Sequence, residues 1–164
     1  MSARGVIYIH SAPPALCPHV EWAVAGVVGM PVDLPWTDQP AARGTLRAEM
    51  SWEGKPGTAA GIASALRGWQ LLRFEVTEDA SPGSDGMRYS GTPTLGLFGA
   101  VIGASGNVLV PEERLHSALA SAGSGDTTLQ AELDRLLGRA WDDELEPFRY
   151  AGDGAPVRWL HAAV

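Results

Sequence analysis

The sequence is short of cysteine and of long apolar runs. A single cysteine among 164 residues excludes an intramolecular disulfide framework. No apolar run approaches the roughly 20 residues that a membrane-spanning helix needs. The β-rich run at residues 6–9 is also too short for the core of a signal peptide. We therefore expect a cytoplasmic protein that does not bind a membrane.

Positive charge is scarce as well. The chain has 12 basic and 19 acidic side chains, and Lys55 is its only lysine. Residues 1–110 carry 7 basic and 9 acidic side chains, whereas residues 111–154 carry 4 basic and 10 acidic ones. A protein that binds the phosphate backbone of a nucleic acid needs concentrated positive charge. Nucleic acid is therefore not an expected partner.

The apolar residues that are present predict an alternation of strands and helices. Their share of 45% is ordinary for one folded domain. Residues 6–9 predict a central strand. Residues 18–28 predict a helix, because Pro18 suits a first turn and Gly29 suits a C-cap. Residues 32–36 alternate as a short strand, and Pro35 places that strand near an edge.

The clearest strand covers residues 45–52, in which Leu46, Ala48, Met50 and Trp52 alternate with polar residues. A second helix over residues 59–67 and a strand over residues 72–76 follow. The order β-α-β-β-α-β predicts an α+β fold of the ferredoxin-like type, with an antiparallel sheet and two helices on one face.

The rest of the chain is expected to extend this unit. Residues 78–86 indicate a polar loop, and residues 95–102 and 108–110 indicate a hairpin. Two helices are expected next, one from residue 111 and a longer one from residues 126–127 to about residue 140. The aromatic tail from residue 141 is expected to pack back on the body. The prediction is one domain with a core at 1–77, a loop and hairpin at 78–110 and an acidic helical extension at 111–164.

His10, Cys17 and His19 are the only candidates for catalysis that the pattern offers. A cysteine at a helix N-terminus has its thiolate stabilised by the helix dipole, and a nearby imidazole can take its proton. Free cysteine is equally one of the most frequently buried residues. The spacing of the three residues matches no closed zinc site. We therefore expect no metal, and the thiol stays open between a catalytic and a core role.

The turn at residues 54–58 is the candidate ligand site. Backbone N–H groups of Gly54 and Gly57, the amine of Lys55 and the hydroxyl of Thr58 would suit a phosphate or carboxylate. The spacing of a phosphate-binding P-loop is absent, and Pro56 removes one N–H group. An ordinary turn from strand to helix explains the same residues.

The six tryptophans suggest a surface for a partner. Trp36 and Trp52 fall on neighbouring predicted strands, and Arg47 lies between them in the sequence. Together they could form a platform for a flat ligand or a peptide. Packing in the core is the alternative for each indole.

Several unusual strings resemble one known family. They are residues 4–13 (RGVIYIHSAP), 16–24 (LCPHVEWAV), 51–58 (SWEGKPGT), 63–69 (ASALRGW) and 106–112 (GNVLVPE). They are similar to an actinobacterial family known as domain of unknown function 3145. The resemblance implies a cytoplasmic protein with a connection to fatty-acid metabolism, and it transfers no catalytic residue or cofactor.

Two functions remain in view. The lack of a complete catalytic motif favours a non-catalytic binding or adaptor protein that acts through protein–protein contacts, with an unidentified protein partner or as a homo-oligomer. The alternative is an enzyme or sensor that binds a small anionic ligand at residues 54–58, near His10, Cys17 and His19. No cofactor is expected in either case.

Overall fold

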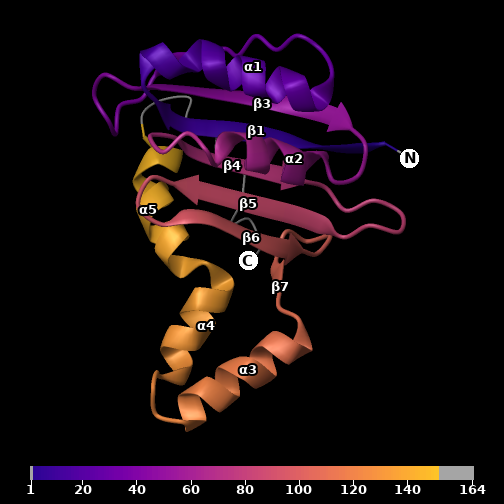
Figure 1. Cartoon of the computed structure of the whole chain (residues 1–164), viewed down its shortest axis with the longest axis vertical. Coiled ribbons are helices and arrows are strands. Elements are labelled where there is room, and N and C mark those ends of the chain that lie inside the picture. The colour runs from indigo at the N-terminus through magenta and orange to yellow at the C-terminus, as the bar shows by residue number, and fades with distance from the viewer. Residues whose placement is uncertain (1, 152–164) are drawn as a thin grey trace.

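The computed structural model describes residues 2–151. Its centre is one antiparallel sheet of seven strands in the order β2-β3-β1-β4-β5-β6-β7 (Figure 1). The strands are β1 (Ala3–Ala12), β2 (Thr37–Asp38), β3 (Leu46–Gly54), β4 (Arg73–Glu78), β5 (Gly86–Thr92), β6 (Gly96–Ile102) and β7 (Val108–Leu109). β1 lies between β3 and β4 and is antiparallel to both.

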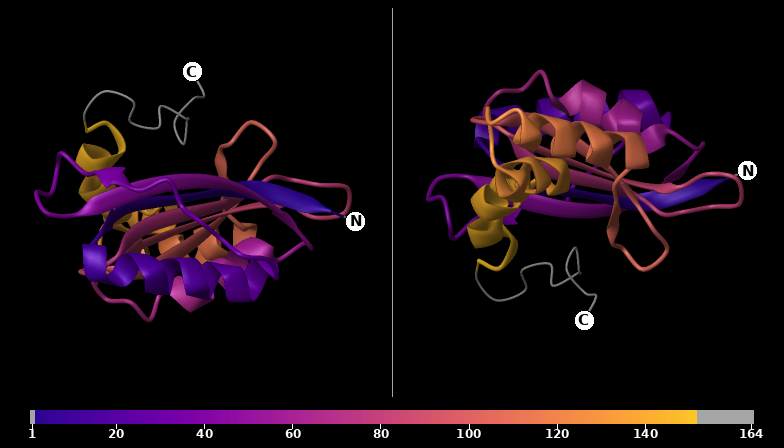
Figure 2. Two further views of the ribbon diagram at one scale, coloured as in Figure 1. Left: turned by 90° about the horizontal axis from the view of Figure 1, so that it is seen from above. Right: turned by 90° about the horizontal axis from the view of Figure 1, so that it is seen from below.

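Helices cover the two faces of the sheet unequally. They are the 3₁₀ turn η1 (Pro14–Leu16), α1 (Cys17–Val28), α2 (Thr58–Leu66), α3 (Glu112–Gly123), α4 (Leu129–Leu137) and α5 (Arg139–Arg149). α1 and α2 lie on one side of the sheet, which we call the helix face, and the C-terminal end of α5 lies on the other (Figure 2). We call that other side the second face.

The main core lies between the sheet and the helices α1 and α2. Ile7 and Ile9 of β1 alternate inward, because successive strand residues point to opposite faces. Val20 and Val24 of α1 and Ile62 of α2 meet them at helical spacing. All five are at most 1% exposed. At about 1.5–3 kcal/mol for each buried aliphatic side chain, this layer supplies much of the drive to fold.

The structure confirms the α+β class and corrects parts of the expected arrangement. The sheet has seven strands. The expected hairpin is present as β6 and β7, and it joins the sheet through β5, a strand that the sequence did not predict. The strand expected at residues 32–36 is wrong; only Thr37 and Asp38 pair, since Pro31 and Pro35 break up the segment.

The two helices expected after residue 111 are three. Gly138 adopts a left-handed conformation with φ of 71° and separates α4 from α5. A Cβ atom at this position would come within 2.5 Å of the Phe98 ring, so glycine suits both the turn and the close approach. The tail packs back on the body as far as Ala151, and residues 152–164 lie outside the described residues.

Candidate functional site

A layer of polar side chains is buried on the second face. Tyr8 of β1 lies opposite Glu75 of β4, which in turn lies opposite Ser90 of β5. The register therefore places these residues in a row across three strands, and His10 follows two residues after Tyr8 on the same side. Their exposed fractions lie between 0% and 4%. A charged carboxylate at such depth requires partners.

Glu75 has those partners. His10 Nε2 lies 2.7 Å from its Oε2, and the Ser90 hydroxyl donates to its Oε1 at 3.1 Å. Arg149, the last residue of α5, donates from Nε to Oε2 at 2.9 Å and from Nη2 to Oε1. The guanidinium therefore forms a bidentate ion pair with both carboxylate oxygens, which is the strongest geometry for this pair.

The pKa values of the pair reflect this contact. Burial alone would raise the pKa of Glu75, but the hydrogen bonds and charges of His10 and Arg149 outweigh burial and lower it to about 2. Burial would lower the pKa of Arg149, but Glu75 and Asp142 raise it instead. Asp142 accepts from Arg149 Nη2 at 2.9 Å. Both groups are therefore charged at neutral pH, and they fasten α5 to the sheet.

A second set of contacts holds the middle of α5. Glu144 accepts hydrogen bonds from Thr92 at 3.0 Å and Thr94 at 3.1 Å, and it lies 3.3 Å from Arg73 Nε. The Arg73 guanidinium also lies 4.6 Å from the centre of the Phe148 ring. Asp142 and Glu144 of α5 thus make contacts inside the molecule, whereas the side chains of Asp143 and Glu146 are exposed.

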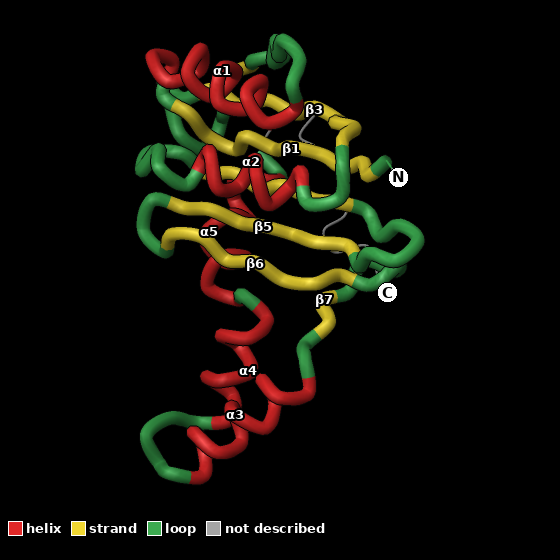
Figure 3. Tube along the Cα trace, turned by 45° about the vertical axis from the view of Figure 1, so that its right-hand side comes forward, coloured by secondary structure: helices red, strands yellow, loops and turns green. Residues whose placement is uncertain are grey.

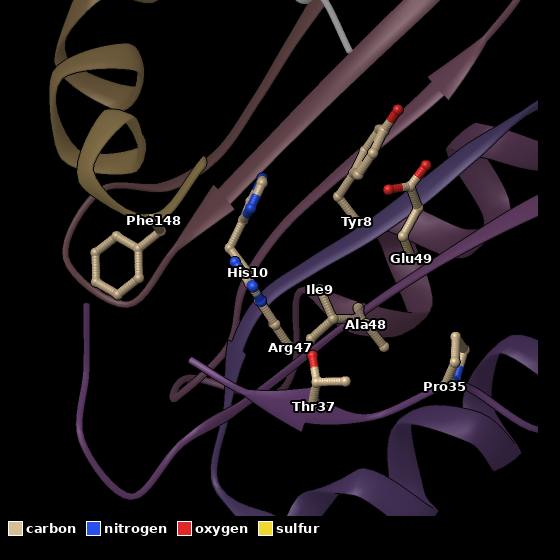
Figure 4. A pocket seen from close by; sticks show the side chains of 9 residues that line it. All are labelled: Tyr8, Ile9, His10, Pro35, Thr37, Arg47, Ala48, Glu49 and Phe148. Carbon is tan, nitrogen blue, oxygen red and sulfur yellow. The ribbon is translucent and has the colours of Figure 1, made fainter. Parts of the chain in front are cut away.

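A small cavity of about 210 Å³ opens beside this layer. Figure 4 shows its lining, to which β1, β3 and α5 contribute His10, Arg47 and Phe148. Arg47 donates to the carbonyl of Ala151 at 2.5 Å. No serine or cysteine is among its described lining residues, so they contain no nucleophile of the serine or cysteine class. In the part of the chain that the structure describes, no group of three or more His, Cys, Asp or Glu side chains could hold a metal ion.

The turn at residues 54–58 is held by a buried carboxylate of the protein itself, a contact that the sequence did not predict. The carboxylate of Glu78 accepts from the backbone N–H of Gly57 at 2.9 and 3.2 Å and from that of Ala59 at 3.1 Å. Glu78 is 2% exposed. An internal anion thus occupies the N-terminus of α2, where the sequence suggested a bound phosphate. The Thr58 hydroxyl donates to the carbonyl of Lys55 at 2.7 Å.

The structure does not bring this turn near His10. Ala3 pairs with Gly54 at one end of β1, whereas His10 lies towards the other end. At about 3.4 Å per residue the two ends are about 24 Å apart. His10 also belongs to the second face, whereas α2 lies on the helix face. A composite site that combines His10 with Lys55 is therefore not formed.

Cys17 and His19 also lie in different surroundings, one buried and the other exposed. Cys17 is buried in the core, and its Sγ lies 3.6 Å from the carbonyl oxygen of Pro13. Burial and the nearby charge of Glu21 raise the pKa of this thiol, which is the opposite of what a catalytic thiolate needs. His19 is exposed and stacks on Trp69, with ring centres 5.4 Å apart.

The residues of the predicted aromatic platform lie on different surfaces of the protein. Trp52 is buried on the helix face, whereas Arg47, at an odd position of the same strand, faces the other side. Trp36 is half-buried, and its Nε1 donates to Glu21 at 2.8 Å. Trp52 and Arg47 therefore do not share a surface.

A larger groove of about 710 Å³ lies along β3. One wall comes from the end of α1 and the linker after it, and its residues are Val27, Val28, Met30, Pro31 and Val32. Met50 and Trp52 belong to the other wall. The predicted ligand residues Gly54, Lys55 and Thr58 lie at its end, although the partner of their turn is Glu78. The groove is large enough for several side chains of a bound molecule.

The helices α3 and α4 extend beyond the sheet (Figures 1 and 3). We call residues 111–137 the helical arm. Ala118 is the only buried residue of α3, and Leu136 is the only one of α4. Large apolar side chains are exposed on the arm and next to it: Leu109, Leu115, Leu119, Leu129 and Leu137. Leu119 is 55% exposed and lies one turn from Leu115, on the same side of α3.

Sequence reasoning missed Glu75 and Arg149, the centre of the buried layer. In the strand predicted over residues 72–76, Glu75 alternates with apolar residues, but one strand cannot show what covers its second face. Arg88, Ser90 and Thr92 alternate with Met87 and Tyr89 in β5, and this period of two was the pattern that could have revealed the strand.

Residues 6–162 match the family described as "Protein of unknown function (DUF3145)". The chain belongs to the DUF3145 family. No curated protein and no solved structure matches it significantly. Within residues 2–151 of this DUF3145 protein, no helix is both long and apolar enough to cross a membrane.

Proposed function

We propose that this DUF3145 protein is a non-catalytic binding or adaptor protein that docks a partner protein on its helical arm. The observation that carries the proposal is the exposure of leucines on two helices that extend beyond the sheet. A helix that buries only one residue gains little stability from packing against the rest of its own chain. Exposed apolar side chains gathered in one region are typical of an interaction surface.

The surroundings of the candidate catalytic residues also support a non-catalytic function. The Cys17 thiol is buried with a raised pKa, and His10 is bonded to Glu75 inside the buried layer. The anion site at Gly57 is filled by Glu78. These residues therefore stabilise the fold, and the enzyme alternative loses the close arrangement on which it depended.

The charge of the arm indicates what kind of partner fits. Residues 111–137 carry five acidic side chains and two basic ones: Glu112, Glu113, Asp126, Glu132, Asp134, Arg114 and Arg135. A complementary surface would be apolar at its centre and basic at its rim. Two copies of the arm would bring like charges together, so a different protein is favoured over a homo-oligomer. A cytoplasmic location and a connection to fatty-acid metabolism complete this proposal and rest on the family resemblance.

Replacement of Leu115 and Leu119 by glutamine tests the proposal, since glutamine has a helix propensity close to that of leucine. A leucine that is buried in an interface contributes about 1.5–3 kcal/mol, so the double variant should bind the partner at least about 100-fold more weakly. The tagged protein and the variant are purified from the native host, and the proteins that co-purify are quantified.

The matched control is Trp22→Gln on α1, where the replaced apolar side chain is 76% exposed. The proposal requires one or more proteins that are retained by the control and lost with the arm variant. Identical sets of proteins from all three samples would refute it.

We also propose that β1–β4 with α1 and α2 form a ferredoxin-like unit within the larger sheet. The order β2-β3-β1-β4, the antiparallel pairings and the placement of both helices on one face support this.

A further inference from the structure

Among the described residues, the outer edge of β3 has no strand partner over most of its length. β2 pairs only with Leu46 and Arg47. Among residues 2–151, no strand pairs with residues 48–54 on the side away from β1. An open edge presents backbone donors and acceptors in a row, and proteins normally cover or block such an edge.

The hydrogen bonds of β1 show which backbone groups point outward. Arg4 accepts from the backbone N–H of Asp79, and Val6 donates to the Thr77 hydroxyl, so both direct their backbone groups toward β4. The residues between them, such as Gly5, direct theirs toward β3.

The partners of those residues on β3 are Met50 and Trp52, opposite Ile7 and Gly5. Because the direction alternates along a strand, the N–H and C=O groups of Glu49, Ser51 and Glu53 point away from β1. Ser51 and Glu53 are exposed. This part of β3 therefore offers an uninterrupted set of outward backbone groups.

The linker between α1 and β2 runs near this edge without pairing with it. Glu21 of α1 accepts from the backbone N–H of Leu34 at 2.9 Å and from the Trp36 indole at 2.8 Å. Pro31 and Pro35 have no N–H to donate. The linker is thus tied to the helix, and the groove of about 710 Å³ separates residues 30–32 from β3.

We propose that the β3 edge binds an extended peptide segment of a partner protein as an additional strand. Residues of an added strand that lie opposite Met50 and Trp52 would enter the apolar groove. Those opposite Glu49 and Glu53 would lie beside carboxylates on the second face. The segment that fits is therefore one in which apolar and basic residues alternate, which is recognition by strand addition.

A second copy of the chain is a poorer occupant. Two antiparallel β3 edges related by a twofold axis at Ser51 would place Glu49 of one copy opposite Glu53 of the other, and like charges opposite one another are unfavourable. This site uses none of the residues of the helical arm. It goes beyond the proposed function, because an adaptor with two separate surfaces can hold two partners at once.

The test uses a labelled heptapeptide of alternating lysine and valine, with a glutamate and valine heptapeptide for comparison. Fluorescence anisotropy measures binding to the full chain, and amide hydrogen exchange followed by NMR reports on β3. The lysine peptide should bind at least about tenfold more tightly than the glutamate peptide. The amide hydrogen of Ser51 should exchange at least about tenfold more slowly when that peptide is bound.

The matched variant is Glu49→Lys with Glu53→Lys, which reverses the charge of the edge but leaves Met50 and Trp52, the apolar side chains of β3 in the groove, unchanged. It should reverse the preference, so that the glutamate peptide binds more tightly. The Leu115→Gln/Leu119→Gln arm variant should bind the lysine peptide as the unaltered protein does, which separates this proposal from the previous one. No binding, an unchanged preference, unchanged Ser51 exchange, or dimerisation through β3 would overturn it.

Discussion

Replacement of Glu75 by glutamine should destabilise the protein by about 3 kcal/mol at neutral pH. The variant keeps the shape of the side chain but leaves the Arg149 guanidinium buried beside a neutral amide. Loss of one member of a buried ion pair costs about 3–5 kcal/mol, and Asp142, 2.9 Å from Arg149, offsets part of that cost. The pKa of Glu75, lowered from 4.5 to about 2, independently corresponds to about 3 kcal/mol.

Urea unfolding followed by far-UV circular dichroism measures this change. The control is Glu53→Gln, because Glu53 is exposed and bonds only to the Ser2 hydroxyl among the described residues; it should shift the unfolding free energy by less than about 0.5 kcal/mol. Adding Arg149→Met to Glu75→Gln should recover part of the loss, since both buried charges are then removed. A loss below about 1 kcal/mol in Glu75→Gln would refute the reasoning.

Three further outcomes are expected from buried groups in the structure. The pKa of Glu75 is lower in the folded than in the unfolded protein, so its contribution to the free energy of unfolding is present above about pH 4.5 and lost as the pH falls toward 2. Measuring the free energy of unfolding as a function of acid pH should show this loss, and Glu75→Gln should lack it. Cys17 should react with iodoacetamide far more slowly in the folded than in the unfolded protein, because burial raises its pKa and blocks access, and equal rates would contradict its place in the core. Gly5→Ala should destabilise by about 1–3 kcal/mol, because the new Cβ would lie 1.8 Å from the Thr77 carbonyl oxygen, whereas Gly123→Ala meets nothing and should be neutral or slightly stabilising.

The parts of the fold with strong local patterns were predictable. Gly29 ends α1 in a left-handed conformation with φ of 76°, as its position after an apolar helical pattern indicates. The alternation in residues 46–52 correctly predicted β3 and its buried face. The hairpin of β6 and β7 follows from the turn at residues 105–107. In these segments local conformation and burial agree, so short-range patterns suffice.

The candidate site was less accessible to sequence reasoning, because its contacts join residues far apart in the chain. Glu75 and Arg149 are 74 positions apart, and neither residue alone indicates that a helix end will cover a sheet. The same applies to Glu78, whose carboxylate fills the N-terminus of α2. The sequence suggested a bound anion at that turn, whereas in the structure a carboxylate of the protein itself accepts from the backbone N–H groups of Gly57 and Ala59.

Partner binding by the helical arm can be tested directly by photo-crosslinking in cells of the native host. A photoreactive phenylalanine analogue is placed at Leu119, which is 55% exposed on the arm, or at Trp22, which is 76% exposed on α1. We predict a discrete crosslinked species with another protein from position 119 and none from position 22. No crosslink at position 119, or the same products from both positions, would contradict the proposal that this DUF3145 protein binds a partner through its arm.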